Sequence, residues 1–129
     1  MIAAVGTVAG VFLVDVEADD LLGEGSEVPE VERPEVPLPR VVAAARSGST
    51  VVAVVERRPP LMLSSDGGAT WREAGGGLPP GFAVAIAEGD PDRMLYAARN
   101  RLYVSANGGV FWRSLGFELP DIHSVAWID

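Results

Sequence analysis

The chain contains no cysteine and no lysine among its 129 residues. The absence of cysteine excludes disulfide bonds, thiolate metal ligands and thiol nucleophiles. The absence of lysine leaves ten arginines against 18 acidic residues, so the net charge is -8. Because affinity for nucleic acid depends on clustered positive charge, we expect no nucleic-acid partner, and anionic membranes are disfavoured for the same reason.

Histidine is nearly absent as well, and His123 is the only one. One imidazole cannot form a histidine-based metal cluster within a chain, and no nucleophile is identified that would build a Ser-His-Asp triad with it. The run Gly75-Gly76-Gly77 lacks the lysine and the helix that follow a phosphate-binding loop. We therefore expect no metal and no cofactor, and we interpret His123 as a turn or strand-edge residue.

Long hydrophobic runs are also missing. The apolar opening from Met1 to Val14 is too short to span a bilayer and lacks the positive leader of a secretory signal. We expect this stretch to be part of the fold, we expect no membrane partner, and a cytoplasmic location is favoured. A hydrophobic content of 48% in a chain of this length suits one folded domain.

An eight-residue motif occurs twice. Ser64 to Trp71 reads Ser-Ser-Asp-Gly-Gly-Ala-Thr-Trp, and 41 positions later Ser105 to Trp112 reads Ser-Ala-Asn-Gly-Gly-Val-Phe-Trp. A Leu-Pro pair follows each copy at a short distance. A fixed period of this size indicates one supersecondary unit repeated along the chain.

Each of the two clear copies predicts four short strands joined by turns, as in one antiparallel sheet. The copies span residues 41–77 and 82–118. The predicted strands are 41–45, 51–56, 61–64 and 70–72 in one copy, and 82–88, 94–99, 102–105 and 111–114 in the other, with a turn at 89–92.

The first copy is divided between the two ends of the chain. Residues 2–7 and 11–14 match the second and third strands of the repeat, while its first strand is missing. The tail from His123 to Asp129 follows Leu119-Pro120, just as the other first strands follow a Leu-Pro pair. We predict that this tail supplies the missing strand, so that the first copy comprises residues 1–37 together with 122–129.

Some strands are apolar on both faces, as Val51 to Val55 shows. Such a strand must lie between two layers, which neighbouring blades around an axis provide. We therefore predict an all-β fold, a β-propeller of four-stranded antiparallel blades with three blades per chain, in a single domain over residues 1–129.

This layout resembles the Asp-box repeats, also called bacterial neuraminidase (BNR) repeats, whose pattern is Ser-x-Asp-x-Gly-x-Thr-Trp. The second motif departs from it at Asn107 and Phe111, and the first copy has Val14 and Val16 at motif positions. The resemblance implies β-propeller blades with the motif at their periphery, away from catalytic centres. Physically, Asp66 and Asn107 are suited to accept bonds from turn N–H groups, and we interpret the motif as structural. Its residues are Ser64, Asp66, Gly68, Thr70, Trp71, Ser105, Asn107, Gly109 and Trp112.

Three copies are too few to close a propeller, because closed propellers contain about four to eight blades. An open arc would also leave two sheet faces uncovered. We predict a homodimer of six blades, with strand exchange or closure between termini, and consider nine blades from three chains less favoured.

Residues 15–39 form an acidic, proline-rich insertion that holds nine of the 18 acids. The prolines exclude a long helix, so we expect an extended loop with one edge strand at residues 27–31. The favoured interpretation is a solvated loop. The alternatives are a docking surface for a basic partner and a weak calcium site. The oxygen ligands of that site would be Asp15, Glu17, Asp19 and Asp20.

Nothing in the chain forms a recognisable catalytic set. Sialidases use three arginines and a tyrosine nucleophile, but no local motif assigns that role here. Glycosidases need two carboxylates across a cleft, and the acids at strand ends are not paired by any pattern. The residues considered were Arg46, Arg99, Arg101, Tyr96 and Tyr103 for the first activity, and Glu56, Glu88, Asp90 and Asp92 for the second.

We therefore expect a non-enzymatic scaffold or protein-interaction module. The alternative from another class is a glycan-binding propeller that stacks sugar rings on Trp71, Trp112 or Trp127. A glycosidase is the least favoured reading.

Overall fold

The structure is a computed structural model that describes residues 1–128, and these form twelve β-strands and no helix. No stretch of the described residues is therefore a helix that could cross a membrane. The all-β prediction is confirmed. The tail strand was predicted to end at Asp129, and that residue lies outside the described residues. The strands are β1 (Ile2–Thr7), β2 (Gly10–Asp15), β3 (Asp20–Glu24), β4 (Val41–Ser47), β5 (Thr50–Val55), β6 (Leu61–Ser64), β7 (Arg72–Ala74), β8 (Ala83–Ala87), β9 (Asp90–Ala97), β10 (Leu102–Ser105), β11 (Arg113–Ser114) and β12 (Ile122–Trp127).

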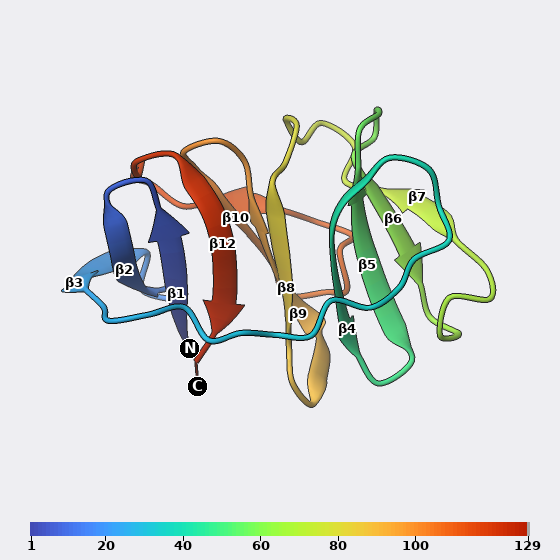
Figure 1. Cartoon of the computed structure of the whole chain (residues 1–129), viewed down its shortest axis with the longest axis horizontal. Coiled ribbons are helices and arrows are strands. Elements are labelled where there is room, and N and C mark those ends of the chain that lie inside the picture. Colours follow the sequence, from blue (N-terminus) through green and yellow to red (C-terminus); the bar gives the residue numbers. More distant parts are fainter. Residues whose placement is uncertain (129) are drawn as a thin grey trace.

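The strands form three antiparallel sheets of four strands each. We call them the first blade (order β12-β1-β2-β3), the second blade (β4-β5-β6-β7) and the third blade (β8-β9-β10-β11). The third blade lies between the other two, because its strand β8 contacts β12 on one side and β4 on the other. Figure 1 shows these three inner strands, β12, β8 and β4, following one another across the molecule. The sheets are thus propeller-like blades arranged in an arc.

The C-terminal strand β12 completes the first blade. It pairs with β1 of the same chain, so that Ala4 lies opposite Ala126 and Val5 lies opposite Val125. The prediction that the tail supplies the missing first strand is confirmed. Of the two arrangements predicted for the tail, the structure has closure within one chain, and β12 lies beside β1 in Figure 1.

Two apolar cores lie between the blades and join them. Val52 and Val54 of β5 pack with Met94 and Tyr96 of β9, which joins the second blade to the third. On the other side of the third blade, its residues pack against Val5 of β1 and its neighbours in the first blade. Because side chains alternate along a strand, the remaining residues of β5 face the opposite way, into a smaller cluster. The two-sided burial expected from the Val51 to Val55 run is confirmed.

Three predicted elements differ from the structure. The outer strand of the first blade is β3, so the strand expected at residues 27–31 is wrong, and that segment has no regular structure. The turn expected at 89–92 is shorter, because β9 already begins at Asp90. The outer strands also begin one residue after each motif tryptophan, at Arg72 and Arg113, since the Trp71 and Trp112 rings are engaged by the preceding turns.

The linker from β3 to β4, residues 25–40, covers part of the outward face of both end blades. At its start, the Gly25 N–H donates to the Val11 carbonyl at 2.9 Å, and Val28 lies against Gly6 of the first blade. At its end, Val36 and Leu38 pack on the outward cluster of the second blade. The linker thus covers part of each of the two sheet faces that an open arc was expected to leave uncovered.

Candidate functional site

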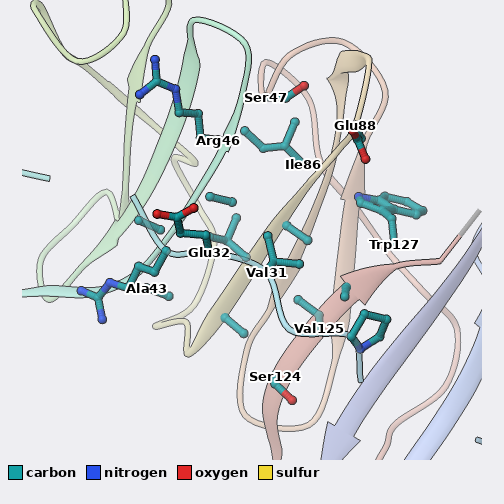
Figure 2. A pocket seen from close by; sticks show the side chains of 18 of the residues that line it. Val31, Glu32, Ala43, Arg46, Ser47, Ile86, Glu88, Ser124, Val125 and Trp127 are labelled. Atoms are coloured by element: carbon teal, nitrogen blue, oxygen red, sulfur yellow. The ribbon is translucent and has the colours of Figure 1, made fainter. Parts of the chain in front are cut away.

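A groove of about 1320 Å³ lies along the inner strands of the arc. Its floor is formed by β4, β8 and β12, one strand from each blade, and small side chains such as Ala43 and Ala85 keep it open. Figure 2 shows Ile86, Val125 and Trp127 directed toward this space from the third and first blades. The groove is where a propeller has its axis, so all three blades contribute to one site.

The roof of the groove is the middle of the linker, residues 26–33, which we call the strap. Val31 and Glu32 of the strap stand over the inner strands in Figure 2. Within the described residues, segment 26–32 makes no hydrogen bond or ion pair. The strap is held at its ends, by Gly25 and by Arg33, whose Nη2 donates to the Val41 carbonyl at 3.3 Å.

Charged side chains of both signs line the groove. The carboxylates of Glu30, Glu32 and Glu88 are exposed and make no ion pair with any described residue. The arginines are engaged with backbone carbonyls, since Arg33 donates to Val41 and Arg46 Nε donates to Gly48 at 2.8 Å. The groove lining therefore carries three carboxylates against two guanidinium groups.

The three tryptophans proposed for glycan contact have different surroundings. Trp71 and Trp112 each donate Nε1 to the carbonyl of a turn glycine, at 3.1 and 3.0 Å, and pack on blade cores. Only Trp127 lines the groove, and its buried Nε1 has no hydrogen-bond partner among the described residues. The structure therefore leaves Trp127 as the one of the three that belongs to this site.

The motif at residues 64–71 forms a closed set of hydrogen bonds. The hydroxyl of Ser64 donates to Asp66 Oδ1 at 2.7 Å and accepts from the Gly68 N–H at 2.8 Å. Asp66 accepts from Thr70 twice, from its N–H at 2.9 Å and from its hydroxyl at 2.5 Å. These bonds from Thr70, followed by that from Ser64, lower the pKa of Asp66 to about 2.

The motif at residues 105–112 repeats this set with one bond fewer. Ser105 donates to Asn107 Oδ1 at 3.0 Å and accepts from the Gly109 N–H at 2.9 Å. The Phe111 N–H donates to Asn107 Oδ1 at 3.0 Å, in place of the threonine N–H. An amide oxygen thus serves as well as a carboxylate here, because one acceptor atom receives the backbone bond. Both motifs lie at the outer side of their blades, between the third and fourth strands, and neither lines the groove.

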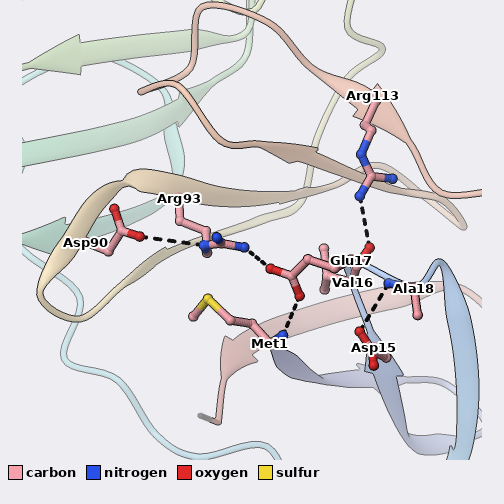
Figure 3. A network of polar contacts seen from close by, with 8 residues as sticks. All are labelled: Met1, Asp15, Val16, Glu17, Ala18, Asp90, Arg93 and Arg113. Atoms are coloured by element: carbon pink, nitrogen blue, oxygen red, sulfur yellow. Dashed lines mark hydrogen bonds and ion pairs between the residues drawn. The ribbon is translucent and has the colours of Figure 1, made fainter.

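The four oxygen-bearing residues considered for calcium do not converge. Glu17 forms ion pairs with Arg93 and with the Met1 amine, as Figure 3 shows. Asp15 accepts from the Ala18 N–H at 3.2 Å, and Asp19 accepts from the Gly116 N–H at 2.8 Å. No group of three metal-binding side chains is found among residues 1–128. Glu17 and Asp19 instead attach the β2–β3 turn to the third blade.

The residues compared with sialidase chemistry are likewise dispersed. Arg99 pairs with Asp121 at 3.2 Å and Arg101 with Glu118 at 3.0 Å, on the outside of the molecule. Tyr96 is fully buried and donates to the Pro79 carbonyl at 2.6 Å, and burial raises the pKa of its hydroxyl. Of this set, only Arg46 lines the groove. The sequence did not reveal the groove itself, since its walls come from three distant segments and its roof has no periodic pattern.

No protein-family profile matches the chain, and no curated protein matches it either. Solved structures that match include the GH74 enzyme of Niastella koreensis, with a TM-score of 0.51, 22% identity, and coverage of 92% of this chain and 18% of that chain. An ancestral GH74 enzyme matches with a TM-score of 0.53, 14% identity, and coverage of 95% of this chain and 18% of that chain. The chain thus spans less than a fifth of the length of either enzyme. GH74 enzymes have β-propeller folds, and at these identities the likeness concerns the fold alone.

Proposed function

We propose that the chain is a non-enzymatic binding module that presents the groove between its inner strands to another macromolecule. The single observation that carries this proposal is the groove, to which all three blades contribute and which the strap roofs with one hydrogen bond to the floor strands among the described residues, from Arg33 to Val41. We also propose that the two turn motifs are Asp-boxes with a structural role, supported by their shared hydrogen bonds.

The proposal is tested by selection from an unbiased display library of ten-residue peptides. The blocking variant is Ser47→Trp, because Ser47 lines the groove at the end of β4, next to the turn into β5. The matched control is Ser114→Trp, which adds the same ring on the exposed outer strand β11. We expect peptides enriched by the native chain and by the control, and lost with Ser47→Trp. Absence of enrichment, or enrichment that persists in Ser47→Trp, would contradict a binding role for the groove.

A glycan ligand is the second candidate, and the position of Trp127 in the groove favours it. An indole ring that lines a groove can stack on the face of a sugar ring. Binding on a glycan array that is lost in Trp127→Ala and kept in Trp71→Ala would support this candidate over a peptide ligand.

Hydrolysis is the least favoured candidate. The likeness to GH74 enzymes concerns the fold, and glycoside hydrolysis needs a carboxylic acid and a second carboxylate on the two sides of the bond. A panel of fluorogenic glycosides is expected to give no turnover with the native chain. Turnover that disappears in Glu88→Gln would replace the binding proposal with an enzymatic one.

Assembly into a six-bladed homodimer stays a prediction. It requires the outward face of the first blade to pack on that of the second blade of another copy, which the linker now partly covers. Light scattering after size exclusion tests it, since a dimer has twice the mass of the 13.5 kDa chain. A monomer at all concentrations would contradict the homodimer prediction. The chain would then exist as an arc of three blades whose end faces are partly covered by its own linker.

A further inference from the structure

The inner strands carry free sheet edges into the groove. Strands β4, β8 and β12 each stand first in their sheet, so one edge of each strand has no neighbouring strand. Across the described residues, no hydrogen bond joins one inner strand to another. Free strand edges present alternating N–H and C=O groups, which is the surface that an added strand recognises.

The strap covers these edges without pairing with them. Its residues 29–33 are exposed to solvent although they line the groove, and Val31 has 64% of its surface exposed. Among residues 1–128, the one bond from the strap to an inner strand is that of Arg33 to the Val41 carbonyl. The backbone groups along the free edge of β8, in the middle of the floor, therefore make no hydrogen bond to the strap.

The charges around this edge favour a basic ligand. Glu30 and Glu32 lie in the roof, and Glu88 follows β8 in the floor. Within the described residues all three lack an ion-pair partner, so the lining holds three unpaired carboxylates against the two guanidinium groups of Arg33 and Arg46. The net charge of -8 adds a long-range attraction for cations.

We propose that the groove binds an extended basic peptide as an added strand on β8. This rests on the proposed binding function and specifies its ligand. The peptide's backbone pairs with the free edge of Ala83–Ala87, a length of about 17 Å at roughly 3.4 Å per residue. Its small or apolar side chains lie on the floor of alanines and valines, and its arginine or lysine heads reach Glu30, Glu32 and Glu88.

The test is fluorescence anisotropy with a fluorescein-labelled peptide that alternates valine and arginine. We expect saturable binding that weakens as salt is added, because the pairs are exposed and screened. In the variant E30Q/E32Q/E88Q we expect affinity to fall by about tenfold. The matched control D20N/E24Q/E56Q removes the same charge from exposed, unpaired acids outside the groove and should stay within about twofold of the native affinity.

A second peptide tests the backbone pairing. N-methylation of alternate residues removes the donors that an added strand needs and keeps every charge, so this peptide should not bind. The proposal is overturned if the native chain does not bind the first peptide, if the triple variant binds it as tightly, or if the methylated peptide binds equally well. Groove-dependent enrichment of peptides of another chemistry in the display selection would leave the binding function standing while this ligand is rejected.

Discussion

The hydroxyl of Ser105 receives the N–H of Gly109 at 2.9 Å and donates to Asn107 Oδ1 at 3.0 Å. Ser105 has 1% of its surface exposed, so water cannot replace these bonds without local opening. We predict that Ser105→Ala lowers the free energy of unfolding by about 1–3 kcal/mol, because the Gly109 N–H is left buried without an acceptor. Urea denaturation measures the loss. Ser114→Ala on β11 is the control and should change stability by about 0.5 kcal/mol or less.

The carboxylate of Asp66 predicts a defined pH dependence. Its pKa is lowered from 3.8 to about 2 in the folded chain, so its bonds stabilise the fold above pH 4 and are lost as the pH falls through 2. Asp66→Asn retains an acceptor for the Thr70 N–H but loses the charged partner of the Thr70 hydroxyl. We predict a lower melting temperature than native at pH 6, and a difference that disappears near pH 2.

Thermal melts across this pH range provide the measurement for Asp66→Asn. The matched substitution is Asn107→Asp, where Phe111 offers no hydroxyl to the second carboxylate oxygen. Ionisation of the carboxylate introduced by Asn107→Asp should therefore stabilise the folded chain less than ionisation of Asp66 does. Equal melting differences at pH 6 and pH 2 for Asp66→Asn would show that the carboxylate charge has no role in the turn.

Gly81 lies against the ring of Tyr96 so closely that a Cβ would come within 2.2 Å of its hydroxyl oxygen. Tyr96 is fully buried, bonded to Pro79, and in edge contact with Tyr103 and Trp112, so it has no room to withdraw. We predict that Gly81→Ala destabilises the fold by about 1–3 kcal/mol through overpacking. Gly76→Ala is the control, because its Cβ would meet no atom within 4 Å. Equal unfolding midpoints of the two variants would contradict this packing.

Val36 and Leu38 are predicted to protect the outward face of the second blade. They pack over Ala53, Val55 and Met62, so replacing both with serine exposes apolar surface and costs about 2 kcal/mol. The variant should also self-associate more than the native chain in light scattering. Val31→Ser, in the exposed part of the strap, should change neither property. An unchanged urea midpoint in the double variant would mean that the linker does not stabilise this face.

The elements that the sequence predicted well are those with strong local patterns. Short apolar runs such as Val51 to Val55, together with the turn residues between them and the two glycine-rich motifs, located most strands. The Leu119-Pro120 spacing located the tail strand. The strand β3 was missed because the five residues Asp20–Glu24 contain two acids and a glycine with positive φ, a composition typical of a loop.

The groove could not be predicted from the sequence for a different reason. Its floor joins β4, β8 and β12, which are adjacent only because the third blade lies between the other two. The strap crosses them with no local pattern that sets its path. Glu30 and Glu32 were visible as part of an acidic stretch, but their relation to Glu88 depends on that crossing.

The pairing of β12 with β1 inside one chain is the central claim, and an engineered disulfide tests it most directly. The chain has no cysteine of its own, and Ala4 lies opposite Ala126 across the two strands. After mild oxidation, A4C/A126C is predicted to run on a non-reducing gel as a cross-linked monomer of 13.5 kDa, while A4C/A53C, whose residues lie in different blades, stays reduced. A covalent dimer would show that the tail strand is exchanged between chains, and free thiols in A4C/A126C would show that β12 does not complete the first blade.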